Sequence, residues 1–467
     1  MKNILLLLLA SFFVYLLHAQ EKNNTFVFTH ANVIPMNKEI VLKDFSVIVK
    51  NGVIEKTGPS ASIKIPAGAF VINAKGKFLI PGLSDMHVHL EGDAWNIMFE
   101  GKSKFTPKEI DFNDILFLYI ANGITTIDVL FAFPEHLVLR EKIRKKEMLG
   151  PRLVLSRMID GAGKAWPPPL GVWINNAEEA KNAIIEMHQQ GYDRVKVYSF
   201  LDKASYDTII ATAKRLNMPV DGHVPFSTSV EHVLASGQKM IAHVEEIAKF
   251  ADGFTPEQVT HFADMLAKSN TWVTSSLILN YNLNALLKDS AGEFSKPGTE
   301  YLHPMCAGVW KYVYQHIYKP IPEKHRLNLI TEYNSFQKPF TYEFYKKGGK
   351  LLSGTDALVP STIPGLSLHQ ELGQLVSSGL TPYEALRVST TNACEFLNEL
   401  SKGGTIEPGK DANLVLLDSN PLQDISNTKK IAGVMTQNQW LPKTKIDKRL
   451  LEIKESYKKL AEEKSRQ

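Results

Sequence analysis

The chain has 467 residues, of which 44% are hydrophobic and 22% are charged, and its formal net charge is +4 at pH 7. This length exceeds that of a usual single domain, and the composition excludes an intrinsically disordered chain. Because the net charge is small and no basic cluster is dense, we expect no nucleic-acid partner.

The N-terminal segment differs from the rest of the chain. Lys2 precedes an apolar run over 4–17, and the small residue Ala19 stands before the polar sequence QEKNN. This order is typical of a secretory signal peptide, with cleavage near Ala19 or Gln20. The run is shorter than the roughly 18 residues of a spanning helix, although Leu17 leaves an uncleaved anchor as the alternative. We expect an exported protein, periplasmic or secreted, without stable membrane association after cleavage.

The next segment, from Thr25 to Val71, contains short β-like pieces with Asn-Gly and Lys-Gly turn signals between them, which predicts a small antiparallel sheet. After Pro81, strand-like runs alternate with amphipathic helical segments such as 176–191 and 203–217, which favours parallel βα units. The candidate strands lie at 83–89, 123–130, 151–157, 193–199, 219–224, 240–245, 271–277 and 350–356. Eight such units favour a (β/α)8 TIM barrel over an open sheet.

Both ends of the chain have the character of β-structure. A strand-like pattern returns after residue 400, and we expect it to pair with the N-terminal pieces, because each alone would leave an unburied face. The predicted organisation is α/β: a signal peptide at 1–20, a small β-sandwich domain from 21–80 and 401–442, a barrel at 81–400, and a charged C-terminal helix at 443–467. The long, aromatic-rich connection at 278–349 predicts extra helices over the barrel mouth.

Strand ends carry the candidate metal ligands. The active site of a TIM barrel lies at the C-terminal ends of its strands. His87 and His89 end the first strand, and residues two apart on a strand share a face, so both imidazoles can reach one cation. His223, His243 and Asp356 end the fifth, sixth and eighth strands. A single strand-end histidine often only bonds a loop, but four histidines and an aspartate at one end favour a metal site.

Lys196 lies in the middle of the fourth strand, between two valines. A lysine that points into a barrel must find a compensating charge or lose its own. A buried ion pair is one interpretation. The other is a neutral amine that adds carbon dioxide to form a carbamate, whose two oxygens can bridge two divalent cations. Tyr198 faces the same way, and its hydroxyl can either bind substrate or simply pack.

The motifs PGLSDMHVH, VKVY, GHVP, IAHVEE, SGTDA and GTIEPGKDANLVLLDSNPL together resemble the amidohydrolase superfamily over nearly the whole mature chain. The lysine of VKVY resembles that of the branch with prolidase-like dipeptidases, which hold two zinc ions bridged by a carbamylated lysine. The imidazolonepropionase branch binds one metal and lacks this lysine. The dipeptidases often have a glycine-rich stretch after the lysine, where this chain has SFLDKASYD, and this departure leaves the substrate open.

The resemblance implies a role for each ligand candidate. His87, His89 and Asp356 would bind the first zinc, His223 and His243 the second, and Lys196 as a carbamate would join the two. Zinc suits this histidine-rich donor set. The implied reaction is hydrolysis of an amide (C–N) bond, in a dipeptide or small peptide, by an activated hydroxide, with Asp356 moving the proton.

Two other functions stay open. One is a mononuclear hydrolase of a cyclic amide or lactone, and the other is a non-catalytic binding protein on the same scaffold. A homo-oligomer is compatible with the sequence. Four histidines away from strand ends are expected in helices or loops, with His303 or its neighbours as the alternative substrate contact: His232, His261, His303 and His369. We interpret Cys306 and Cys394 as buried thiols that could oxidise if they met, and PPPLG at 167–171 as a mouth loop.

Overall fold

The barrel contains the eight parallel strands that the sequence predicts. The computed structural model describes residues 24–90, 110–164 and 166–466. The strands are β6 (Leu83–Val88), β7 (Ile124–Val129), β8 (Arg152–Gly161), β10 (Arg194–Val197), β11 (Val220–Gly222), β12 (Met240–Ile241), β13 (Trp272–Thr274) and β14 (Leu351–Leu352). A bridge between Val88 and Ala357 and a hydrogen bond from Met86 N to Ser353 O (2.9 Å) join β14 to β6. The TIM-barrel prediction is therefore confirmed.

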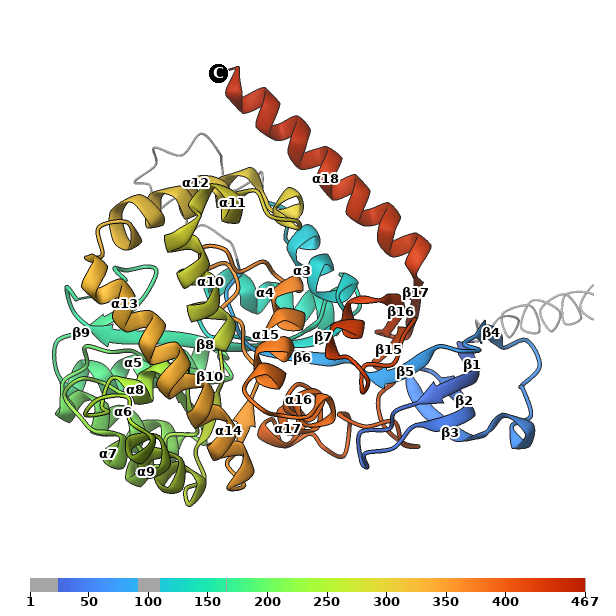
Figure 1. The fold of residues 1–467 in the computed structure, drawn as a ribbon, viewed down its shortest axis with the longest axis horizontal. Coiled ribbons are helices and arrows are strands. Elements are labelled where there is room, and N and C mark those ends of the chain that lie inside the picture. Colours follow the sequence, from blue (N-terminus) through green and yellow to red (C-terminus); the bar gives the residue numbers. More distant parts are fainter. Residues whose placement is uncertain (1–23, 91–109, 165, 467) are drawn as a thin grey trace, which may run out of the picture.

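Helices surround the barrel (Figure 1). They are α3 (Phe112–Ala121), α4 (Pro134–Arg144), α5 (Ala177–Gln190), α6 (Lys203–Arg215), α7 (Val230–Ser236), α8 (Glu245–Ala248), α9 (Pro256–Ala267), α14 (Lys338–Lys346), α15 (Leu366–Ser377), α16 (Pro382–Val388) and α17 (Thr391–Phe396). Helix α5 illustrates how the local sequence sets the ends and the buried face of a helix. Asn176 caps its first turn, Gly191 ends it in the left-handed region, and Ile184 and Met187 lie on its buried face.

The strands at the two chain ends form one continuous mixed sheet. They are β1 (Thr25–Val33), β2 (Leu42–Lys50), β3 (Val53–Pro59), β4 (Phe70–Asn73), β5 (Phe78–Pro81), β15 (Leu414–Leu417), β16 (Ile431–Thr436) and β17 (Gln439–Pro442). Strand β15 pairs antiparallel with β5, and β1 pairs in parallel with β5. Phe28 and Val47 share a buried core with Leu414 and Met435, so the two terminal segments bury each other's apolar faces. Strand β5 runs on directly into β6 (Figure 1).

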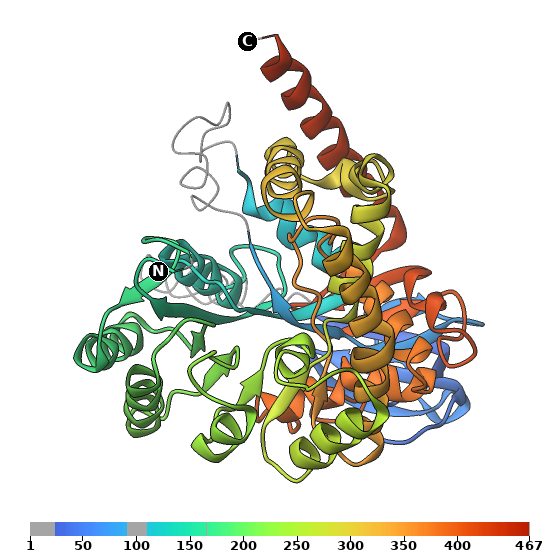
Figure 2. The same ribbon diagram turned by 60° about the vertical axis from the view of Figure 1, so that its left-hand side comes forward.

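The connection between β13 and β14 is largely helical. It contains α10 (Leu277–Lys288), α11 (Ser290–Phe294), α12 (Pro304–Val313), the π-helix η4 (Tyr314–Tyr318), α13 (Glu323–Glu332), the π-helix η5 (Tyr333–Gln337) and α14. Figures 1 and 2 show α10, α12 and α13 grouped beside one another. Leu279, Val313 and Tyr318 from this connection line the cavity at the barrel mouth, where the sequence predicts the extra helices to lie.

The C-terminal helix α18 (Lys443–Ser465) projects beyond the barrel at its far end (Figure 1). Ile453 and Tyr457 are buried, whereas Leu451 is 57% exposed. Cys306 is buried, Cys394 is partly exposed, and both are free thiols. The expected signal peptide lies outside the described residues. Within the described ranges, no helix combines the length and apolarity needed to cross a membrane.

Candidate metal centre

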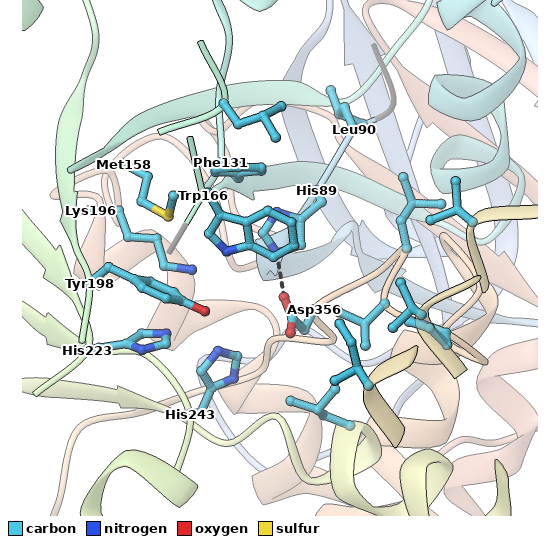
Figure 3. A pocket seen from close by; sticks show the side chains of 18 of the residues that line it. His89, Leu90, Phe131, Met158, Trp166, Lys196, Tyr198, His223, His243 and Asp356 are labelled. Carbon is cyan, nitrogen blue, oxygen red and sulfur yellow. Dashed lines mark hydrogen bonds and ion pairs between the residues drawn. The ribbon is translucent and has the colours of Figure 1, made fainter. Parts of the chain in front are cut away.

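His87, His89 and Asp356 meet at the mouth of the barrel. Nε2 of His89 lies 2.5 Å from Oδ1 of Asp356, and Nε2 of His87 lies 3.2 Å from the same oxygen. The pairing of β6 with β7 shifts register between Asp85 and Val88, and such a bulge re-aims the side chains of a strand end. Figure 3 marks the contact between His89 and Asp356 with a dashed line.

The loop that carries Asp356 is bonded to β6. Thr355 donates to the buried Asp85 carboxylate from both its backbone N (2.9 Å) and its Oγ1 (2.6 Å), and Asp356 N donates to His87 O (2.7 Å). A Cβ at Gly354 would lie 2.7 Å from His87 Cβ, so only glycine permits this approach. Asp356 itself has a φ of 57°, a left-handed conformation that non-glycine residues adopt rarely and often at functional sites.

His243 joins this group from the end of β12, also with a positive φ of 70°. The donor atoms of His87, His243 and Asp356 lie within 4.8 Å of one another. The rings of His87 and His243 are 4.3 Å apart between centroids, and those of His223 and His243 are 5.5 Å apart. The three donors that lie closest together therefore include His87, which the resemblance assigns to the first metal, and His243, which it assigns to the second. The division of ligands between two metals stays a prediction.

Lys196 is buried on β10, with Nζ 3.4 Å from Nε2 of His87. In the described parts of the chain, no carboxylate lies within ion-pair distance of this Nζ, so the ion-pair interpretation has no partner there. Burial lowers the pKa of Lys196 to about 8. Figure 3 shows the Lys196 amine and the Tyr198 hydroxyl both pointing into the cavity toward Asp356.

His223 is oriented by Glu246, the last residue of the IAHVEE motif and one that the sequence alone does not mark as part of the site. Nδ1 of His223 lies 2.9 Å from Oε1 of Glu246 and 2.9 Å from Oγ of Ser199. Burial alone would raise the pKa of Glu246, but His223 and the contacting Lys249 lower it to about 2. A carboxylate on the far ring nitrogen is the usual support of a metal-binding histidine.

The imidazoles have the protonation and open positions that a cation requires. Burial holds the pKa of His87 and His223 below the ordinary value and lowers that of His243 to about 3, so these rings are neutral. Each of the four histidines keeps one buried ring nitrogen without a hydrogen-bond partner: His87 Nδ1, His89 Nδ1, His223 Nε2 and His243 Nδ1. Nε2 of His87 and Nε2 of His89 face Asp356, and Nε2 of His223 has no partner, so this neutral donor set fits a metal.

A cavity of about 300 Å³ opens beside these donors, and its walls are mainly apolar and aromatic. Trp166, which precedes the PPPLG sequence, and Leu170 within that sequence line the cavity, and the Trp166 indole hydrogen-bonds with Tyr198. His303 does not reach it: His303 caps α12 and packs on Tyr457. The seventh connection contributes apolar side chains such as Val309 instead.

Comparison with known proteins identifies the class. A model described as the amidohydrolase family matches residues 78–441, and the chain therefore belongs to this family of metal-dependent hydrolases that act on C–N bonds. The superfamily expected from the motifs is confirmed.

Individual relatives are more distant. A protein assigned as a prolidase from Bifidobacterium longum superposes with a TM-score of 0.68 at 21% identity, over 92% of this chain and 98% of that one. A Xaa-Pro dipeptidase with bound methionine in its active site has a TM-score of 0.66 at 20% identity, over 90% and 100%. A 44-residue stretch is 48% identical to a dihydroorotase of Trichlorobacter lovleyi, which is 9% of this chain and only 10% of that relative.

Proposed function

We propose that this protein is an exported amidohydrolase that cleaves the C–N bond of a small amide or short peptide at a dinuclear zinc centre bridged by carbamylated Lys196. The donors would be His87, His89, His223, His243 and Asp356, together with the carbamate of Lys196. When bound, the two zinc ions would supply a water of lowered pKa and polarise the substrate carbonyl.

The Lys196 amine carries the dinuclear proposal. It is buried, lies 3.4 Å from a metal-donor nitrogen of His87, and has no carboxylate partner among the described residues. Its lowered pKa favours the neutral amine that must attack carbon dioxide. Addition of this neutral amine to carbon dioxide, with loss of one proton, would give a carbamate whose single negative charge is shared by two oxygens.

Asp356 and Tyr198 would transfer the proton and bind the substrate oxygen. Asp356 is held by His89 and by the loop bonds to β6, so its carboxylate can take a proton and return it to the leaving nitrogen. Tyr198 directs its hydroxyl into the same cavity and can donate to the substrate oxygen. The aromatic and aliphatic walls exclude water from the reacting groups.

Metal content measured together with amide hydrolysis tests the proposal. Wild type should hold two zinc ions per chain and cleave members of a dipeptide and aryl-amide library. Lys196→Ala should retain one ion or fewer and lose most activity, and added formate or acetate should restore part of it by supplying carboxylate oxygens. Lys214→Ala on the exposed face of α6 is the matched control. Two metals and full activity in Lys196→Ala would contradict the carbamate bridge.

A mononuclear hydrolase of cyclic amides or lactones is the second candidate. The three donors that lie closest together, in His87, His243 and Asp356, are enough for one ion. This candidate predicts one zinc per chain in both wild type and Lys196→Ala, with activity on cyclic amides or lactones.

Export is part of the proposal because Lys2, the apolar run over 4–17 and Ala19 form a signal-peptide pattern. Expression of the full chain in a bacterium, followed by fractionation and N-terminal sequencing, should recover a soluble form that begins near residue 20 or 21. Recovery of the intact N-terminus in the membrane fraction would favour the uncleaved anchor.

A further inference from the structure

Glu245 is a charged residue of the cavity wall that the metal centre does not use. It begins α8, two residues after His243, and its side chain lines the cavity with apolar neighbours such as Leu279 and Val313. Besides the histidines, the charged side chains of this lining are Lys196, Glu245 and Asp356, within the part of the chain that the structure describes. The proposed centre takes Lys196 and Asp356, which leaves Glu245 as the acidic residue of this lining without an assigned role.

A network of amides holds this carboxylate in place. Asn280 Nδ2 donates to Oε2 of Glu245 (2.8 Å) and also lies within hydrogen-bond distance of Gln337 Oε1 (3.2 Å), while Gln337 Nε2 donates to Glu332 (2.7 Å). All of these partners are uncharged except Glu332, which is itself acidic. The nearest cationic side chain on the same helix, Lys249, bonds to Glu246 instead. Among described residues, Glu245 therefore has no ion-pair partner.

The charge of Glu245 acts on the same space as the metal donors. Tyr198 and Tyr318 line the same cavity as Glu245. The wall thus combines an anionic group with aromatic rings, a combination that suits an organic ammonium ion and not a second anion.

We propose that Glu245 is a specificity residue that binds a protonated amine of the substrate, so that the preferred substrates are amides with a free amine close to the scissile bond and an apolar side group. The role of Glu245 in substrate choice rests on the proposed function, whereas binding of an amine at Glu245 does not depend on turnover. The apolar group would lie against the aliphatic wall, and the ammonium would replace the missing ion-pair partner of Glu245.

A matched pair of ligands tests the site without catalysis. We expect 2-phenylethylamine to bind the zinc-loaded wild type at least 10-fold more tightly than 2-phenylethanol in titration calorimetry. Glu245→Gln keeps the acceptor for Asn280 and removes the charge, so it should abolish this difference. Glu455→Gln, an exposed residue of α18, is the control. Equal binding of the two ligands to wild type, or a difference that survives in Glu245→Gln, would overturn the proposal.

Hydrolysis provides the second arm. Phenylalanine p-nitroanilide and its N-acetyl form differ in the charged amine, and wild type should prefer the free amine at least 10-fold in kcat/KM. Glu245→Gln should lose this preference, mainly through a higher KM for the free amine. Hydrolysis of both forms without preference would contradict the amine site at Glu245 and leave the proposed function intact. Charge-dependent amine binding without hydrolysis of any amide would contradict the proposed function and still support the amine site.

A second variant guards against a folding defect. Asn280→Ala keeps the charge of Glu245 but removes the amide that fixes it, so amine binding should weaken by a smaller factor than in Glu245→Gln. An Asn280→Ala protein that binds amine as weakly as Glu245→Gln, despite a wild-type melting temperature, would contradict a role for the charge.

Discussion

The Glu246 carboxylate lies 2.9 Å from Nδ1 of His223, on the side of the ring away from its unpartnered Nε2. This contact fixes the tautomer, because a carboxylate with a pKa of about 2 can only accept a hydrogen bond at neutral pH. Nδ1 must then carry the proton, and the lone pair of Nε2 is free for a metal. The support for the proposed second metal thus comes from α8, the helix that follows β12.

Replacing Glu246 with Gln should weaken metal binding without removing a ligand. The amide can turn its N–H toward His223 and favour the wrong tautomer, and loss of such support typically costs about 10- to 100-fold in metal affinity. Chelator competition followed by metal analysis measures this. Glu257→Gln, an exposed carboxylate on α9, is the control. An unchanged affinity in Glu246→Gln would mean that Ser199 alone orients the ring.

Tyr198→Phe should lower kcat by about 100- to 1,000-fold while KM changes little, because a donor to the developing oxyanion acts mainly in the transition state. Tyr206→Phe is a matched control: it is a buried tyrosine whose hydroxyl bonds Ser236 and Gln238, and it does not line the cavity. It should lose about 1 kcal/mol of stability and keep kcat. Equal kcat values for the two variants would reduce Tyr198 to a packing residue.

Gly354→Ala should destabilise the protein by about 1–3 kcal/mol, because the added methyl group forces His87 and the Asp356 loop apart. Metal retention should fall with it. Gly373→Ala in α15 has no atom within 4 Å of the added Cβ, and it should be neutral or slightly stabilising. Chemical denaturation of both apo proteins compares them. A stability of Gly354→Ala equal to that of Gly373→Ala would mean that β6 and the loop can separate without cost.

Glu332 should make stability fall as pH rises. Burial raises its pKa from 4.5 to about 7, so between these values the folded chain keeps a proton that the unfolded chain releases. The free energy of unfolding therefore decreases from about pH 4.5 to pH 7, and the full penalty applies above pH 7. Because the side chain is partly exposed, we expect Glu332→Gln to gain about 1–2 kcal/mol at pH 8 and little at pH 4.5.

Denaturation curves of wild type and Glu332→Gln at several pH values, with Glu455→Gln as control, measure this pH dependence of the free energy of unfolding. A gain in Glu332→Gln that is the same at pH 4.5 and pH 8 would show that the carboxylate does not titrate in this range in the folded protein.

The sequence predicts the barrel because apolar strand-like runs alternate with amphipathic helical segments, and it locates the donors because strand ends are recognisable. It does not show how the donors are supported. Glu246 looks like any acidic loop residue, and its contact with His223 arises only when β12 lies beside β11. Strand lengths also differ: β14 comprises two residues where 350–356 was expected, because the loop after it turns to place Asp356 and leaves the hydrogen-bonded ladder. The bond between Trp166 and Tyr198 joins two separate loops and has no local signal.

Arg157 provides the last prediction, because it ties together two walls of the cavity. It is buried on β8, and its guanidinium donates to Ala132 O (3.0 Å), Leu170 O (2.9 Å) and Pro169 O (2.6 Å). These carbonyls belong to the loop that follows β7, which contributes aromatic side chains to the cavity, and to the PPPLG loop, which contributes Leu170. The guanidinium has enough donors in one plane to hold all three carbonyls at once, whereas an ammonium holds fewer at defined angles.

Arg157→Met should leave these carbonyls unsatisfied and release the PPPLG loop. We expect KM for apolar substrates to rise about 10-fold, since misplacing positioning groups costs binding of this order, while zinc content stays at the wild-type value because no ligand is touched. Arg157→Lys should fall between the two proteins. Hydrogen exchange over 162–171 measures the loop directly, and faster exchange there at unchanged KM would show that the PPPLG loop does not shape the substrate site.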